Sequence, residues 1–130
     1  MIILDASVVI EMLLQTDDGI AITERVLGDN ESLHAPHLID IEVAQVLRRY
    51  VLRGELKAER AQQALEVMAE FPIARYEHEP LLARIWELRE NLTAYDAAYV
   101  ALAEGLNATL LTRDRKLSAV PVLGGVVELV

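Results

Sequence analysis

The sequence contains no cysteine among its 130 residues. This absence excludes a disulfide scaffold, a thiolate nucleophile, an iron–sulfur cluster and a cysteine-based zinc site. Aromatic residues are also scarce, at 5%, which disfavours a surface built to stack many bases. No apolar run approaches the ~20 residues that span a bilayer, and no basic, apolar leader precedes Asp5. We therefore expect a cytoplasmic protein without a membrane partner.

Positive charge is scarce as well. The chain has 12 Lys and Arg against 21 Asp and Glu, which gives a net charge of −9. This balance argues against a protein that holds nucleic acid by bulk charge, but it is compatible with acids gathered around a cation. Hydrophobic residues make up 53% of the chain, which is enough to form a core, and the length predicts a single domain over residues 1–130.

Short apolar runs alternate with longer helical segments. Strands are predicted at residues 2–4, 33–35, 73–76, 109–112 and 126–130. Helices are predicted at 6–14, 17–27, 38–53, 58–71, 79–91 and 95–104, with a helical turn at 114–119. Glycines at 28, 54 and 105 are expected to end helices, and Gly124-Gly125 fits a hairpin turn or a loose connection equally well. The alternation predicts an α/β fold with a parallel sheet covered on both faces.

Four acids stand out by position. Asp5 and Asp114 follow the first and fourth predicted strands, and the carboxyl ends of parallel strands are where function gathers. Glu42 and Asp96 lie on predicted helices. Each acid also has a purely structural explanation: Asp5 and Asp114 can cap the helices that follow them, Asp96 stands three residues after Thr93 in a capping-box-like position, and Glu42 can lie on a solvated face.

Nearby cations are missing for three of these acids. No Lys or Arg occurs at residues 1–24 or 90–112, so Asp5 and Asp96 have no local ionic partner. Glu42 has no basic residue one helical turn away. Partly buried carboxylates without cations are costly. If these acids converge, a divalent metal is their natural counterion.

Four blocks of sequence are more specific than any single residue. They are Ile-Leu-Asp-Ala-Ser at 3–7, Ala-Pro at 35–36 with Ile-Glu-Val at 41–43, the stretch Leu-Thr-Ala-Tyr-Asp-Ala-Ala-Tyr-Val-Ala-Leu-Ala-Glu at 92–104, and Leu-Leu-Thr-Arg-Asp at 110–114. In this order they resemble the PIN-domain family, and more narrowly the VapC-type toxins of toxin–antitoxin pairs. The resemblance covers essentially the whole chain.

The resemblance implies a three-layer α/β/α sandwich around a short, mainly parallel sheet. It also implies an Mg²⁺- or Mn²⁺-dependent ribonuclease whose metal-site acids match Asp5, Glu42, Asp96 and Asp114. Asp5 and Asp96 are the expected direct ligands, and the other two acids complete the cluster directly or through water. Ser7 and Thr112 match the family's small polar positions beside the site.

The expected partners are an RNA substrate and a cognate antitoxin, with DNA contacted only through that antitoxin. Apolar side chains of the predicted helix at 79–91 exceed what one small core needs and indicate a homodimer or an antitoxin groove. Arg113, Arg115 and Lys116 offer local positive charge to RNA, and they equally fit a solvated turn. Core positions are expected for Tyr50, Trp86, Tyr95 and Tyr99.

Two other functions compete with the ribonuclease hypothesis. The chain can be a catalytically silent PIN-like module that only binds RNA or protein. A haloacid-dehalogenase-like phosphatase also begins with a strand and an Asp, but it requires a second Asp where this chain has Ser7. A dinucleotide-binding domain is disfavoured because the glycine-rich motif is absent.

Overall fold

The computed structural model describes residues 1–121 and 125–130. Over these residues, five strands form one parallel sheet in the order β3-β2-β1-β4-β5. The strands are β1 (Ile2–Leu4), β2 (Leu33–Pro36), β3 (Ile73–Tyr76), β4 (Thr109–Thr112) and β5 (Val127–Leu129). The helices are α1 (Ala6–Leu14), α2 (Asp17–Gly28), α3 (Ile39–Leu52), α4 (Ala58–Glu70), the 3-10 turn η1 (Glu79–Leu81), α5 (Leu82–Glu87), α6 (Ala94–Leu106) and α7 (Arg115–Ser118). The predicted α/β/α sandwich is confirmed.

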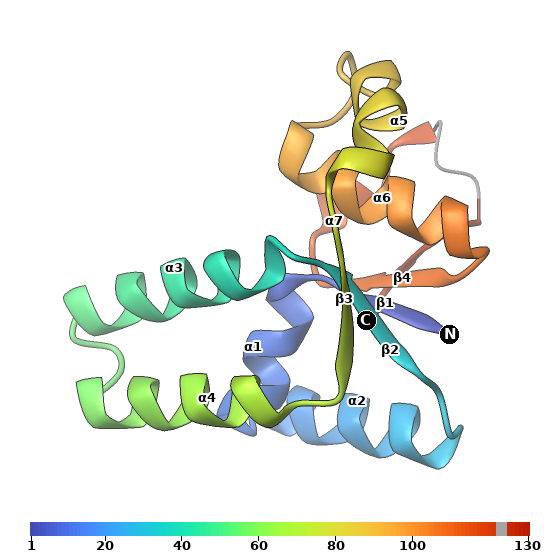
Figure 1. The fold of residues 1–130 in the computed structure, drawn as a ribbon. Helices are drawn as coiled ribbons and strands as arrows, with labels where there is room; N and C mark the ends of the chain where they lie inside the picture. The colour runs from blue at the N-terminus through green and yellow to red at the C-terminus, as the bar shows by residue number, and fades with distance from the viewer. Residues whose placement is uncertain (122–124) are drawn as a thin grey trace.

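The strand order reverses at β1. The chain adds β2 and β3 on one side of β1, then returns to add β4 and β5 on the other. Because crossovers between parallel strands are right-handed, the helices before and after β3 cover opposite faces. Figure 1 shows α1 to α4 grouped on one side of the sheet and α5 to α7 on the other. Ligand sites in such sheets lie outside the carboxyl ends of the strands where the order reverses, which here means the ends of β1 and β4.

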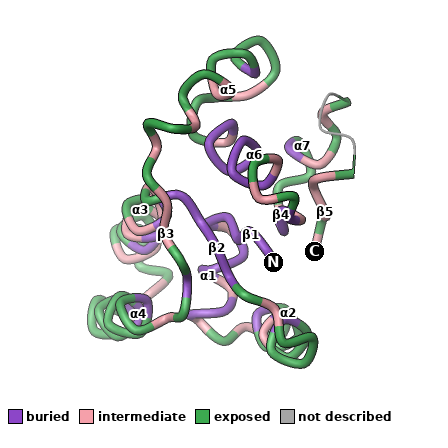
Figure 2. Tube along the Cα trace, turned by 45° about the vertical axis from the view of Figure 1, so that its right-hand side comes forward, coloured by how far each residue is buried: buried purple, intermediate pink, exposed green. Residues whose placement is uncertain are grey.

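Burial is concentrated in the central strands and in α6. All three residues of β1 are buried, and so are seven successive residues of α6 from Ala97 to Ala103. Helix α6 packs against α5, β1, β2 and β4, and Figure 2 shows it buried along most of its length whereas α4 is largely exposed. This burial reflects the place of α6 as the central cover of one face of the sheet.

Glycine ends only one of the three helices where it was expected. Gly54 follows α3 with φ +74°, as predicted. Helix α6 instead continues through Gly105 and ends at Asn107, and α2 includes Gly28 before the chain turns at Asn30; both asparagines have a left-handed backbone, with φ 51° and 53°. Asparagine tolerates this conformation because its short polar side chain bonds locally.

The predicted helix at 79–91 is shorter than expected. A 3-10 turn containing Pro80 leads into α5, which ends at Glu87. Of its apolar residues, Leu88 joins the core whereas Trp86 is 68% exposed. Tyr95, in the first turn of α6, is also exposed, so the core assignment is correct for Tyr99 and wrong for these two aromatics.

Two further observations complete the fold. Gly124 lies outside the described residues, so the turn proposed there is not described; β5 pairs parallel to β4. Among the residues that are described, no helix combines the length and the apolar character needed to cross a bilayer.

Candidate active site

The four acids singled out in the sequence line one hollow. Asp5 follows β1, Glu42 and Asp96 lie in the first turns of α3 and α6, and Asp114 follows β4. The hollow has a volume of about 390 Å³ and lies where the strand order reverses. The fold thus brings together four acids that come from separate elements and are spread along the chain from residue 5 to residue 114.

Asp5 is the most enclosed of the four. Its Oδ1 accepts hydrogen bonds from the Ser7 hydroxyl (2.5 Å) and from the backbone N–H of Val8 (3.2 Å), and its Oδ2 accepts one from the Thr112 hydroxyl. Burial raises the pKa of Asp5, and these hydrogen bonds lower it in part. The two small polar residues predicted beside the site therefore hold this carboxylate, which also caps α1.

Thr112 also connects Asp5 to Asp114. Its Oγ1 accepts the backbone N–H of Asp114 at 3.0 Å, and Asp114 Oδ1 accepts the N–H groups of Lys116 (2.9 Å) and Leu117. Asp114 is thus the N-cap of α7, as its structural explanation proposed, while it still lines the hollow. Capping occupies one of its carboxylate oxygens.

Glu42 is held by a residue that the sequence did not identify as part of the site. The Tyr99 hydroxyl donates to Glu42 Oε1 at 2.6 Å. Burial raises the pKa of Glu42; the Tyr99 bond lowers it, and the charges of Asp96 and Asp5 raise it. Tyr99 lies three residues after Asp96 on α6, a spacing that places both on one helical face, and this spacing is the signal that identifies it.

Asp96 has no side-chain hydrogen bond within the described part of the chain. Thr93 caps α6 by accepting the Asp96 N–H at 3.2 Å, and no reciprocal bond from the Asp96 carboxylate completes a capping box. Burial raises its pKa, and the charges of Asp114 and Asp5 raise it further. Capping of α6 by Thr93 therefore leaves the Asp96 carboxylate without a hydrogen bond to the described residues.

The acids also lack cationic partners. The ion pairs found between described residues include none of the four. Carboxylates without cations around one hollow are a donor set that suits Mg²⁺ or Mn²⁺. Within the described residues, no group of three or more His, Asp or Glu side chains is arranged so that it could hold a metal ion. Shared metal binding therefore requires some of these side chains to change position.

Two arginines line the hollow with the acids. Arg113 is already paired, with Asp18 at 2.9 Å and Glu11 at 3.8 Å. Arg49 lies seven residues after Glu42, two turns along the same face of α3. Arg49 is therefore not among the residues one helical turn from Glu42. Arg115 and Lys116, which the sequence also offered for RNA, are not among the residues that line this hollow.

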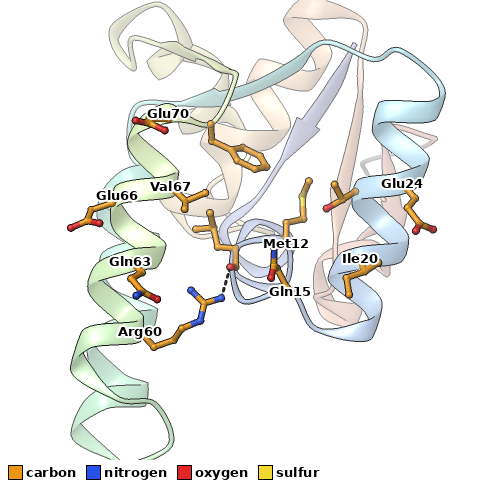
Figure 3. A pocket seen from close by; sticks show the side chains of 12 residues that line it. Met12, Gln15, Ile20, Glu24, Arg60, Gln63, Glu66, Val67 and Glu70 are labelled. Carbon is orange, nitrogen blue, oxygen red and sulfur yellow. Dashed lines mark hydrogen bonds between the residues drawn. The ribbon is translucent and has the colours of Figure 1, made fainter.

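A larger hollow of about 840 Å³ lies elsewhere, between the end of α1 and helices α2 and α4. Figure 3 shows Met12, Ile20 and Val67 around it, with Arg60 donating to the carbonyl oxygen of Leu13. None of the four acids lines it. The larger hollow therefore lacks the grouped acids that make the smaller one the candidate site.

Repulsion between the acids predicts an effect on stability that needs no substrate. A carboxyl whose pKa is raised by folding stabilises the fold more as pH falls towards that pKa. Without metal, the free energy of unfolding should therefore rise between pH 7 and about pH 5.5. Asp96→Asn should stabilise the metal-free protein at pH 7 by about 0.5–1 kcal/mol, the size of one partly screened charge interaction, and should flatten this pH dependence.

Urea unfolding in chelator, across pH, measures both effects. Burial lowers the pKa of His34, which opposes the trend below neutral pH, but equally in both proteins. Asp29→Asn is the control, because Asp29 is exposed and does not line the hollow. Identical pH profiles for wild type and Asp96→Asn would show that the acids do not repel one another.

Known proteins share both the sequence and the fold. The PIN domain family matches residues 2–123. Ribonuclease VapC9 of Mycobacterium tuberculosis is 48% identical over 118 residues, which cover 91% of this chain and 89% of that protein. The crystal structure of PAE2754 from Pyrobaculum aerophilum has a TM-score of 0.74 at 25% identity, covering 97% of this chain and 81% of that one. VapBC2 from Rickettsia felis, solved with a DNA fragment from its promoter, has a TM-score of 0.71 at 18% identity and covers 99% and 98%. The chain belongs to the PIN-domain family and, within it, to the VapC ribonucleases.

Proposed function

We propose that this chain is a metal-dependent endoribonuclease and the toxin of a toxin–antitoxin pair. One observation supports this most strongly: four acids from separate elements line one hollow at the reversal of the strand order, and none of them forms an ion pair with another described residue. The identity of 48% to a protein named as a ribonuclease supplies the substrate class. A haloacid-dehalogenase-like phosphatase loses support, because Ser7, where its second Asp would stand, instead holds Asp5.

Asp5 and Asp96 are the proposed direct ligands of Mg²⁺ or Mn²⁺, with Glu42 and Asp114 completing the set directly or through water. A divalent ion there supplies positive charge to the phosphate and lowers the pKa of a water molecule. Oε2 of Glu42 is available for metal binding because the Tyr99 hydroxyl bonds Oε1. Asp96 retains both oxygens, since neither makes a hydrogen bond to the described residues.

The chain's own residues position the reaction. Ser7 and Thr112 fix the orientation of the Asp5 carboxylate, and Thr112 joins the ends of β1 and β4. Either Glu42 or Asp114 can accept a hydrogen bond from the attacking water and so orient it towards the phosphorus. No histidine is needed as a base, and none of the residues lining the hollow is a histidine.

The partners follow from the family. We propose that a cognate antitoxin inhibits the enzyme, that DNA is contacted only through that antitoxin, and that the toxin forms a homodimer. VapBC2 from Rickettsia felis was solved bound to a DNA fragment from its promoter, which supports an antitoxin partner and an association of the pair with DNA. The dimer proposal is supported by exposed apolar side chains such as Trp86 and Leu82.

The direct test is RNA cleavage by the purified protein. We expect a structured RNA to be cut with Mg²⁺ or Mn²⁺ and to stay intact in excess chelator, with cleavage restored when the ion is added back. Cleavage that persists in chelator, once contaminating nucleases are excluded, contradicts the metal mechanism. RNA binding without cleavage at any metal concentration would instead identify a silent binding module.

A further inference from the structure

We infer that Arg49 is an RNA-binding residue of this site, and that its guanidinium holds a phosphate next to the one that is cleaved. The inference rests on the proposed ribonuclease function and extends it to a residue that the family resemblance did not include. Arg49 lines the acidic hollow from α3 and is exposed. Within the residues that the structure describes, its side chain forms neither an ion pair nor a hydrogen bond.

The need for such a cation follows from the charge of the molecule. With a net charge of −9 and five acidic side chains around the hollow, the four acids and Glu11, the surface repels a polyanion unless positive charge is placed locally. Arg113 also lines the hollow, but Asp18 and Glu11 already neutralise it. Arg49 therefore supplies the uncompensated positive charge among the described residues that line this hollow.

The position of Arg49 indicates which phosphate it binds. Seven residues separate it from Glu42, which is about 10 Å along the axis of α3. An RNA chain whose cleaved phosphate lies among the acids then has a neighbouring phosphate near Arg49. The planar guanidinium donates two parallel hydrogen bonds to phosphate oxygens, a geometry that lysine lacks. Because this contact exists before and during the reaction, it supports substrate binding rather than the chemical step.

The adjacent residue is a matched control. Arg48 has the same charge and is also exposed, but it points to a different hollow, between α3 and α4, lined by Leu47, Val51 and Leu65. Arg48→Gln and Arg49→Gln therefore change net charge equally and differ only in place. Arg49→Lys keeps the charge and removes the paired hydrogen-bond geometry.

Binding is measured by fluorescence anisotropy with a short labelled single-stranded RNA in Mg²⁺, with every variant made in an Asp96→Asn background so that the RNA is not consumed. We expect Arg49→Gln to weaken binding about tenfold, the effect of losing one charge-assisted contact, and to lower the slope of log affinity against log salt by about 0.7. Arg49→Lys should lie between, and Arg48→Gln should match the background protein.

Steady-state cleavage in the otherwise wild-type protein gives the second measurement. Arg49→Gln should raise KM and leave kcat nearly unchanged. If wild type cleaves RNA but the Arg48 and Arg49 variants bind and cleave alike, this inference is wrong and the proposed function stands. If wild type cleaves no RNA at all, the proposed function fails first, and a selective loss of binding in Arg49→Gln would still place the RNA at this hollow.

Discussion

Asp96→Asn is expected to reduce RNA cleavage by at least about a hundredfold while leaving the protein folded. Loss of a residue that only supports a metal ligand already costs about 10- to 100-fold, and Asp96 is proposed to bind the metal itself. Its carboxylate makes no hydrogen bond within the described structure, so replacing it by the isosteric amide removes charge without breaking a structural contact. Cleavage rates and circular dichroism of the same preparations measure the two effects.

Asp5→Asn should abolish cleavage as well, but it is a less clean test. Asp5 accepts bonds from two hydroxyls and caps α1, so its loss also disturbs the junction between β1 and β4. Asp29→Asn, away from the hollow, should cleave like wild type. Activity within a few-fold of wild type in Asp96→Asn would remove Asp96 from the metal site.

Expression of the wild-type chain alone should stop the growth of the host cell, and co-expression with the cognate antitoxin should restore it. A ribonuclease that acts on cellular RNA depletes it catalytically, so a modest amount of enzyme suffices. The measurement is colony formation after induction, with and without the antitoxin gene.

Asp96→Asn provides the control that connects this toxicity to the site. At equal protein levels, the variant should permit growth without antitoxin. If it arrests growth as strongly as wild type, the toxicity does not come from this hollow. The variant should still form a complex with the antitoxin, which distinguishes loss of chemistry from loss of structure.

Local sequence predicted most of the fold. Strands at 2–4, 73–76 and 109–112 have the predicted bounds, because each is a short run that is followed at once by a charged residue. The predicted ends of α2 and α6 differ from the observed ends because asparagine, rather than glycine, takes the left-handed position after each helix. Trp86 and Tyr95 were wrongly assigned to the core, since apolar spacing does not reveal that α5 and the start of α6 lie at the rim.

The site was only partly predictable, for a related reason. Asp5, Glu42 and Asp96 were recognisable because each lacked a cation in its own stretch of sequence, and Asp114 was recognisable because it follows a predicted strand. Tyr99 and Arg49 escaped notice because their roles depend on the packing of α6 against the sheet and on two full turns of α3. Contacts such as Thr112 with Asp5, 107 residues apart, are set by the sheet order, which propensity does not encode.

The position of β1 between β2 and β4 has a consequence for synthesis on the ribosome. Asp5 and Glu42 are made well before Asp96, Thr112 and Asp114. Until β4 is released, β1 lacks one of its two neighbouring strands and Asp5 lacks the Thr112 hydroxyl that bonds its Oδ2. A nascent or truncated chain that ends before β4 therefore cannot assemble the acids, and the ribosome that makes this protein is exposed to a complete site only once Asp114 has been translated.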